Sequence, residues 1–195
     1  MSNGVNENLR ESAVFNLSNA VTMVVDDSAF GADLTSLALR GFGIQVRYSC
    51  FSAAAAIKIL ESHQVDLILV DCEMPGMDGH EFVRWVRNSG LEPNAYVPII
   101  MTAAHVRKSK VGDVRDCGAN YLVTKPFSAS SLLERLIWVA RDTRPFLEVG
   151  DYKGPDRRGR EGLPRERNER RADMIALNNK KARSLAEAIE QAGPV

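Results

Sequence analysis

The segment that most constrains the fold runs from Val65 to Gly79, where a short apolar run is followed at once by polar and turn-forming residues. The apolar run, Leu67 to Val70, is unbroken, which is typical of a strand covered on both faces in a parallel sheet. Asp71 follows the strand directly, and Pro75 and Gly76 predict a turn before a helix. The sequence therefore places a carboxylate at the carboxyl end of a buried strand, where open α/β sheets bind their ligands.

Apolar strands and helices alternate along residues 21–141. Strands are expected where short apolar runs end in polar or turn residues, over Val21–Val25, Ile44–Tyr48, Leu67–Val70, Val97–Met101 and Tyr121–Val123. A segment with apolar residues at helical spacing follows each strand; in the first, these residues are Phe30, Leu34, Leu37 and Ala38, and Gly41 ends the helix. Ser52 and Ser128 are in position to cap the second and fifth helices. Five strands alternating with five helices predict an α/β fold with a doubly wound five-stranded parallel sheet and helices on both faces.

The two ends of the chain differ from this central region in composition. Residues 1–20 are polar and rich in Asn and Ser, which indicates a flexible N-terminal arm. Residues 142–172 are rich in turn-forming and charged residues, and Lys153–Arg171 contains 8 basic and 4 acidic side chains. We expect this segment to be a basic linker or interaction tail. Residues 173–192 regain apolar residues at helical spacing, so a terminal helix is expected there.

Cysteine content and hydropathy bear on where the protein works. Cys50, Cys72 and Cys117 are odd in number and widely spaced, which argues against a disulfide framework or a zinc site. No run approaches the roughly 20 apolar residues that a membrane-spanning helix needs, and residues 1–20 lack the basic start and apolar segment of an export signal. We therefore expect a cytoplasmic protein without membrane insertion.

Polar residues follow four of the five predicted strands, and in a parallel sheet those strand ends share one edge. Asp26 and Asp27 follow the first strand, Asp71 the third, Thr102 the fourth and Lys125 the fifth. Three carboxylates in one cleft form an oxygen site that suits Mg²⁺, which would offset their mutual repulsion. A divalent ion, a lysine and a hydroxyl around one carboxylate suit phosphoryl transfer, with Asp71 as the nucleophile. Lys125 would then supply charge to the phosphoryl oxygens, and Thr102 a hydrogen bond.

The order of these residues, with Met74-Pro75-Gly76-Met77-Asp78-Gly79 after Asp71 and with Lys125-Pro126-Phe127, resembles the receiver domain of bacterial two-component response regulators. The resemblance covers about residues 20–141 and implies a (βα)5, flavodoxin-like fold. It implies that Asp71 accepts phosphate from a sensor histidine kinase or a histidine phosphotransfer protein. Asp27 and Asp71 would bind Mg²⁺ through their side chains, Glu73 through its backbone carbonyl, and Asp26 mostly through water. Thr102 and Lys125 would read the phosphate and shift the surface of the fourth helix, fifth strand and fifth helix.

Three positions depart from the pattern of this family. Leu122 stands three residues before the lysine, where the family commonly has an aromatic residue that moves with the threonine, so such a switch would require neighbouring Tyr121 to take its place. Glu73 and Ala104 occupy the positions whose side chains flank the attacking water in the family. We therefore expect the lifetime of the phosphorylated state to differ from that of a typical chemotaxis receiver.

A regulator whose output is a phosphorylation-dependent contact with a downstream protein is the first hypothesis. The segment Tyr152–Arg158 resembles short tails of some single-receiver regulators. A DNA-binding regulator acting through the tail is an alternative, but nucleic-acid binding is disfavoured because the basic run includes four acids and no interleaved aromatic residue. The intact acidic pair, acceptor, threonine and lysine argue against a scaffold that is never phosphorylated. A phosphotransferase enzyme would need a substrate pocket that the sequence does not indicate, so we expect a non-enzymatic regulator.

Overall fold

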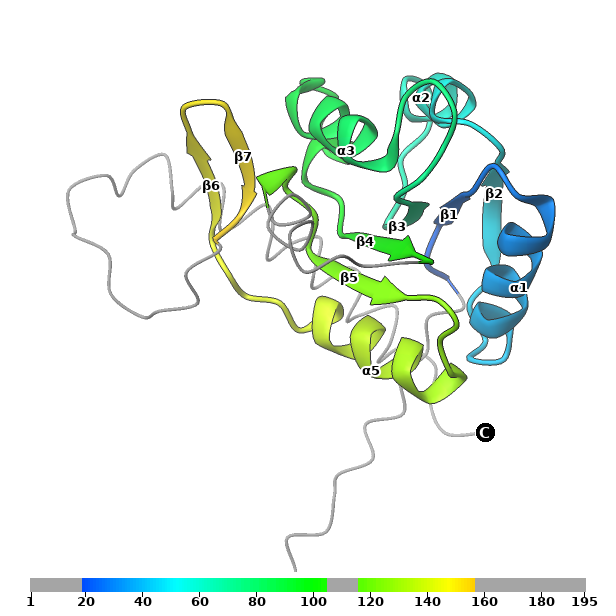
Figure 1. Cartoon of the computed structure of the whole chain (residues 1–195). Helices are drawn as coiled ribbons and strands as arrows, with labels where there is room; N and C mark the ends of the chain where they lie inside the picture. The colour runs from blue at the N-terminus through cyan, green and yellow to red at the C-terminus, as the bar shows by residue number, and fades with distance from the viewer. Residues whose placement is uncertain (1–18, 105–115, 157–195) are drawn as a thin grey trace, which may run out of the picture.

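The computed structural model describes residues 19–104 and 116–156, and within them a five-stranded sheet lies between two layers of helices (Figure 1). The strands follow the order β2-β1-β3-β4-β5, and every pairing is parallel. Their bounds are β1 Thr22–Val25, β2 Val46–Cys50, β3 Leu67–Asp71, β4 Ile99–Ala103 and β5 Tyr121–Thr124. The doubly wound parallel sheet predicted from the sequence is confirmed.

The helices of the described residues cover both faces of this sheet. Their bounds are α1 Ala29–Arg40, α2 Ala53–Leu60, α3 Gly79–Asn88, η1 Asn94–Tyr96 and α5 Ala129–Ala140. Helices α2 and α3 cover one face, and α1 and α5 cover the other (Figure 1). Along β3, Ile68 and Val70 are buried under α2 and α3, whereas Leu67 and Leu69 are buried on the face of α1 and α5. This burial on both faces explains why the strand is apolar without interruption.

Each of these α-helices begins after a polar residue whose side chain accepts a hydrogen bond from a backbone amide three residues later. These N-cap residues are Ser28, Ser52, Asp78 and Ser128. The predicted caps at Ser52 and Ser128 are confirmed. At α3 the cap is reciprocal, because the Glu81 side chain also accepts from the Asp78 amide. Such caps stabilise a helix start by about 1 kcal/mol each and fix where each loop at the carboxyl edge of the sheet ends.

The buried face of α1 is not the face that carries its largest apolar residues. Phe30, Leu34 and Leu37 are 72, 49 and 65% exposed, so these large apolar side chains do not face the sheet. The residues that do so are small or medium-sized, namely Ala32, Thr35, Ser36 and Leu39. Both sets have helical spacing, so spacing alone does not decide which of them turns toward the sheet. Apolar spacing therefore indicates that this segment is a helix, but it does not show which side of the helix faces the sheet.

Strands β2 and β4 begin two residues later than predicted. Ile44 is not yet in the strand, because its N–H donates to the carbonyl of Leu39 in the last turn of α1, after a turn at Gly43 where φ is 77°. β4 begins after Pro98, which has no N–H to donate to the sheet. Both strands nevertheless lie in the predicted order and keep their carboxyl ends at the same edge.

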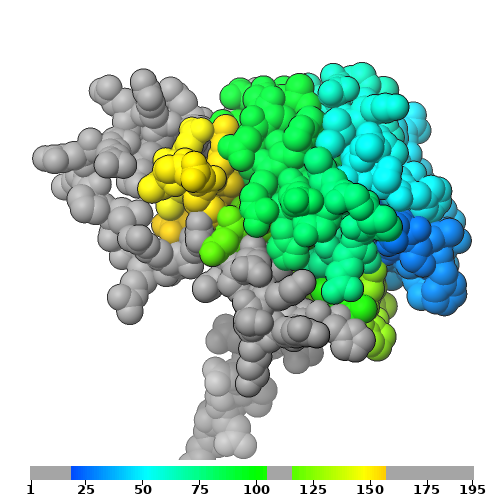
Figure 2. Space-filling view, turned by 45° about the horizontal axis from the view of Figure 1, so that its top comes forward, coloured from blue at the N-terminus to red at the C-terminus, as the bar shows by residue number. Residues whose placement is uncertain are grey.

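Residues 146–155 form an antiparallel hairpin where the sequence predicts a linker. Its strands are β6 Phe146–Val149 and β7 Tyr152–Pro155, joined by a turn at Gly150. The ring of Phe146 packs edge to face on Tyr96, with 4.9 Å between centroids. Figure 2 shows the hairpin in yellow against the green surface of the domain, on the side away from α1. The hairpin is therefore part of the folded domain, held by contacts that its charged, turn-rich composition does not reveal.

Several predictions fall on residues 1–18, 105–115 and 157–195, which lie outside the described residues. These are the N-terminal arm, the fourth helix, the distal part of the tail and the terminal helix. Among the residues that the structure describes, no helix is both long enough and apolar enough to cross a membrane.

Candidate functional site

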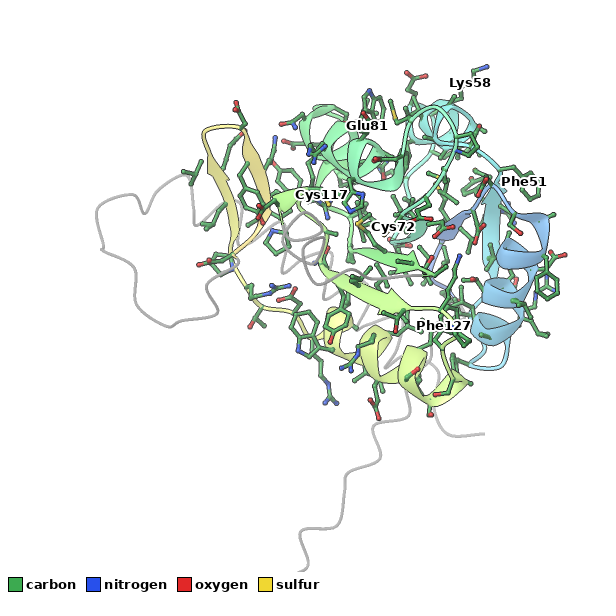
Figure 3. The ribbon with its side chains drawn as sticks, in the orientation of Figure 1. Phe51, Lys58, Cys72, Glu81, Cys117 and Phe127 are labelled. Atoms are coloured by element: carbon green, nitrogen blue, oxygen red, sulfur yellow. The ribbon has the colours of Figure 1, made fainter. Side chains whose placement is uncertain are left out.

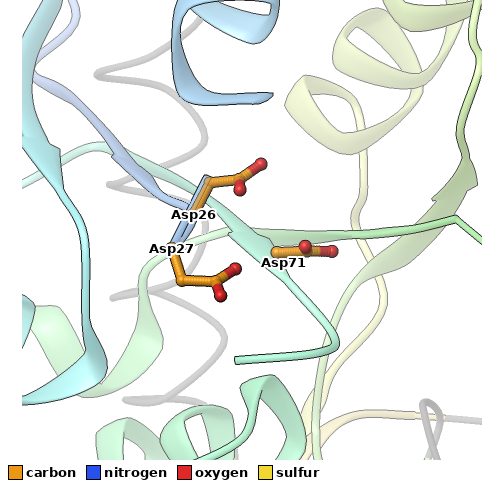
Figure 4. A group of neighbouring side chains, drawn as sticks. All are labelled: Asp26, Asp27 and Asp71. Atoms are coloured by element: carbon orange, nitrogen blue, oxygen red, sulfur yellow. The ribbon is translucent and has the colours of Figure 1, made fainter. Parts of the chain in front are cut away.

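Three carboxylates meet at the carboxyl edge of the sheet (Figure 4). Asp26 and Asp27 directly follow β1, and Asp71 is the last residue of the neighbouring strand β3. One oxygen of each carboxylate lies within 4.8 Å of the others. Asp26 is buried, Asp71 is half-buried and Asp27 is exposed. The structure thus brings together the three acidic residues that the strand ends predict.

Lys125 approaches this acidic group from the end of β5. Its ammonium nitrogen lies 2.8 Å from Oδ2 of Asp26 and 3.3 Å from Oδ2 of Asp71. Burial by itself would lower the pKa of Lys125, but the hydrogen bond with Asp26 and the charges of both aspartates raise it above its ordinary value. Lys125 is therefore a cation at neutral pH, shared between two carboxylates.

Asp71 lies in surroundings that disfavour its charged form. Burial raises the pKa of Asp71 above its ordinary value; the charge of Lys125 opposes this and that of Asp26 adds to it, and the net shift is upward. Oδ1 of Asp71 is buried and accepts no hydrogen bond from any described residue. A cation bound to that oxygen would supply the missing partner.

Thr102 lies beside Asp71 on the adjacent strand, where the two residues are paired in the sheet. Its side chain is buried, and its hydroxyl lies 3.5 Å from the carbonyl oxygen of Val70, too far for a strong hydrogen bond. The hydroxyl is therefore held only weakly in this structure and is close to the Asp71 backbone.

The loop between β3 and α3 folds back over the end of β3. The Gly79 N–H donates to the carbonyl of Cys72, and a Cβ at Gly79 would collide with the backbone carbonyl oxygen of Asp71. Glycine is required at this crossing because any side chain would push the loop away from Asp71. Glu73, exposed in this loop, and Ala104, exposed after β4, flank the site. The metal-binding carbonyl of Glu73 and the altered phosphate lifetime stay predictions.

Tyr121 and Leu122 lie on opposite faces of the sheet. Consecutive residues of a strand point to opposite faces, and Leu122 packs with the core under α2 and α3, while Tyr121 packs on the side of α5. The Tyr121 ring lies edge to face on Trp138, with 5.3 Å between centroids, and the Arg135 guanidinium lies 4.8 Å from it. In this structure Tyr121 is therefore tied to α5 and is separated by the sheet from the side of Leu122.

The three cysteines are buried, and none of them forms a disulfide with another described residue. Figure 3 shows Cys72 and Cys117 in the interior between the sheet and α3. Burial raises the pKa of Cys50 to about 11 and that of Cys72 to about 12, with further contributions at Cys72 from nearby acidic groups. Thiols with such pKa values are poor nucleophiles. Cys72 is therefore a packing residue, although it is the neighbour of Asp71.

Two residues at the start of α1 contact Asp26 although no motif marks them. The Ser28 N–H donates to Oδ1 of Asp26 at 3.0 Å. Gly31 lies against the same carboxylate, and a Cβ there would be 2.5 Å from Oδ2 of Asp26. A glycine in the first turn of an otherwise regular helix is the one sequence signal that could have drawn attention to this contact.

These observations define a class of protein: a doubly wound α/β domain with an acidic group and a lysine at the carboxyl edge of its sheet. The model of the response regulator receiver domain matches residues 22–137, and the chain belongs to this family. The match ends before the hairpin of β6 and β7.

Similar proteins are found among chemotaxis and transcriptional regulators. The chemotaxis protein CheY of Pseudomonas aeruginosa is 28% identical over 114 residues, which are 58% of this chain and 90% of that protein. The phosphate regulon transcriptional regulatory protein PhoB of the same organism is 32% identical over 136 residues, 68% of this chain and 55% of that protein. The solved structure of chemotaxis response regulator CheY4 of Vibrio cholerae has a TM-score of 0.55 at 29% identity, covering 62% of this chain and 98% of that one.

Proposed function

We propose that this chain is a response regulator of a phosphorelay, in which Asp71 accepts a phosphoryl group from a phosphohistidine on a sensor histidine kinase or a histidine phosphotransfer protein. An oxygen of Asp71 would attack the phosphorus, and the P–N bond would break with its electron pair passing to the imidazole. An acyl phosphate would result. Membership of the receiver family and the position of Asp71 within the acidic group support this assignment.

Lys125 and Thr102 would stabilise the phosphoryl group as it arrives. The Lys125 ammonium is 3.3 Å from Oδ2 of Asp71, so a small movement would bring it to the oxygens of a phosphoryl group on that residue. Within the described part of the chain, the Thr102 hydroxyl would give up only its long contact with the Val70 carbonyl. Catalysis of this kind depends mainly on positioning and on neutralising charge, which these two side chains can do without forming a covalent bond.

Mg²⁺ fits the acidic group. Carboxylate oxygens are the ligands it prefers, and three of them lie within 4.8 Å of one another. A buried oxygen of Asp71 also accepts no hydrogen bond from the residues that the structure describes. Asp27 and Asp71 would hold it through side chains, Glu73 through its backbone carbonyl, and Asp26 mostly through water. When bound, the ion would neutralise negative charge on the transferred group.

The phosphohistidine donor would dock over the exposed apolar stripe of α1, formed by Phe30, Leu34 and Leu37. Phe51, which is 55% exposed, extends this stripe at the end of β2, and Figure 3 places it at the outer surface beside α1. Large apolar side chains gathered on a surface are typical of a protein contact. The N-cap of α1, Ser28, directly follows Asp27 of the acidic pair. A partner bound to this stripe would therefore lie next to the site.

The output would be a phosphorylation-dependent contact with a downstream protein, and the chain would act as a non-enzymatic regulator in the cytoplasm. β5 connects the site to α5, because Lys125 follows β5 directly and Tyr121 at its other end contacts Trp138 of α5. Movement of Lys125 toward a phosphoryl group would therefore change the conformation of the surface formed by β5 and α5.

Intact-protein mass spectrometry after incubation with acetyl phosphate and Mg²⁺ tests the proposal. We expect the wild type to gain the mass of one phosphoryl group and Asp71→Asn to gain none. Asp33→Asn is the matched control, because Asp33 is exposed on α1 and takes no part in the acidic group. An equal gain in wild type and Asp71→Asn would show that the acceptor is another residue.

A further inference from the structure

Gly31 of α1 lies with its Cα against the carboxylate of Asp26. A Cβ at this position would be 2.5 Å from Oδ2, 2.9 Å from Cγ and 2.9 Å from Oδ1 of Asp26. Non-bonded heavy atoms in close-packed interiors do not approach so closely without displacement. Any residue other than glycine would therefore compete with the Asp26 carboxylate for the same space.

Backbone conformation does not explain this glycine. The described glycines with positive φ are Gly43, Gly76, Gly90, Gly118 and Gly150, and Gly31 is not among them. Gly31 lies inside α1, where alanine would favour the helix more strongly. The three atoms nearest to its missing Cβ all belong to Asp26. What distinguishes Gly31 from the glycines with positive φ is therefore the space that it leaves for the Asp26 carboxylate.

Asp26 uses that space to make two contacts that orient its carboxylate. Oδ1 accepts a hydrogen bond from the Ser28 N–H at 3.0 Å, and Oδ2 contacts the Lys125 ammonium at 2.8 Å. Lys125 is nearer to Asp26 than to Asp71, where the distance is 3.3 Å. A methyl group at position 31 would have to rotate Asp26 or move the first turn of α1, and either change alters these contacts.

We propose that Gly31 is a positioning residue, which admits the Asp26 carboxylate between α1 and Lys125 so that Asp26 both holds the lysine and faces a divalent cation. This role rests on the proposed function, which places that cation beside Asp27 and Asp71. Gly31 contributes no atom to the site and acts only through Asp26.

A Mg²⁺ titration followed by backbone amide NMR shifts tests this role in the full chain. We expect Gly31→Ala to raise the Mg²⁺ dissociation constant about tenfold, as is typical when a residue that orients a metal ligand is changed. Gly41→Ala is the matched control at the other end of the same helix, because its φ is −58° and the nearest atom to its Cβ is 3.3 Å away. It should keep the wild-type dissociation constant.

A double-mutant cycle with Asp26→Asn separates action through Asp26 from a general disturbance of α1. In the Asp26→Asn background, adding Gly31→Ala should weaken Mg²⁺ binding no further, because the carboxylate that Gly31 positions is already lost. Losses that add, or a Gly31→Ala protein that binds Mg²⁺ like the wild type, would overturn the role of Gly31 while leaving the proposed function intact. A wild type that binds no Mg²⁺ would overturn both.

Discussion

At the carboxyl edge of the sheet, a buried oxygen of Asp71 accepts no hydrogen bond from the described residues, whereas at the amino edge Arg87 is fully buried with its guanidinium hydrogen-bonded on several sides. The acceptors of Arg87 are the carbonyls of Gly118, Ala95 and Val97 and the side-chain oxygen of Asn120, at 2.8–3.1 Å. At the carboxyl edge a charged oxygen is left available to a ligand, whereas at the amino edge the charged guanidinium is hydrogen-bonded within the protein. The difference separates the part of the fold that serves function from the part that serves stability.

Arg87 is buried without an ion pair to any carboxylate of the described residues. Burial lowers the pKa of Arg87 to about 10, so it remains charged at neutral pH. Its guanidinium lies 5.2 Å from the centre of the Phe146 ring, which belongs to the hairpin. Gly154 of the hairpin also lies against Gly118, close enough that a Cβ on Gly154 would be 2.6 Å from the Gly118 Cα. The hairpin thus packs over the buried arginine and over the turn before β5.

The largest expected effect is at the amino edge. Arg87→Ala should lower the free energy of unfolding by about 4 kcal/mol, because several buried acceptors lose their donor and a cavity remains. Urea denaturation measures the loss. Arg84→Ala, at an exposed position on the same helix, should stay within about 0.5 kcal/mol of the wild type. Similar losses in the two variants would contradict the distinction between the edges.

The next effect is in the hairpin. Phe146→Ala should lower the free energy of unfolding by about 3 kcal/mol, because Phe146 is buried and contacts both Tyr96 and Arg87. Val149→Ala on the same strand is the control, since Val149 is 57% exposed. A Phe146→Ala protein as stable as Val149→Ala would mean that the hairpin is an appendage and does not stabilise the domain.

The smallest of these effects has the opposite sign and lies at the carboxyl edge. Without divalent cations at pH 7, Asp71→Asn should raise the free energy of unfolding by on the order of 1 kcal/mol, because repulsion from Asp26 and burial of charge are removed while the contact with Lys125 offsets part of the gain. Urea denaturation at several pH values measures it. A destabilised Asp71→Asn would show that the lysine contact outweighs the repulsion.

The pH dependence of that difference follows from the raised pKa of Asp71. In the folded state the carboxyl binds its proton more tightly than in the unfolded state, so its contribution to stability falls as pH rises. Wild type and Asp71→Asn should therefore differ least where Asp71 is protonated in both states, below its ordinary pKa of 3.8. The difference should grow as pH rises and be complete above the folded-state pKa. A difference that shrinks with rising pH would contradict the upward shift.

The meeting of Asp26, Asp71 and Lys125 could be predicted from the sequence because it depends on topology. Parallel strands bring their carboxyl ends to one edge whatever the packing beneath them, so polar residues just after apolar runs converge. The buried face of α1 could not be predicted in the same way. Its two stripes have the same spacing, and the buried one is the stripe that goes with the close approach of Gly31 to Asp26, a tertiary contact.

The amino edge was not predictable for a different reason. The hydrogen-bond acceptors of Arg87 are mostly backbone carbonyls, which every residue carries, so no sequence pattern marks this arginine as buried. The hairpin likewise depends on Phe146 meeting Tyr96, a contact between residues 50 positions apart. Contacts of this kind are decided by tertiary packing and leave no local periodicity.

Chemical trapping of the phosphorylated residue tests the central claim most directly. Borohydride reduction converts an aspartyl phosphate to homoserine, which peptide mass mapping locates after the wild type has reacted with acetyl phosphate and Mg²⁺. The site geometry, with Lys125 and the acidic pair around one partly buried carboxylate, predicts homoserine at position 71 alone. Homoserine at position 26 or 27, or no conversion in a protein that has gained phosphoryl mass, would contradict it.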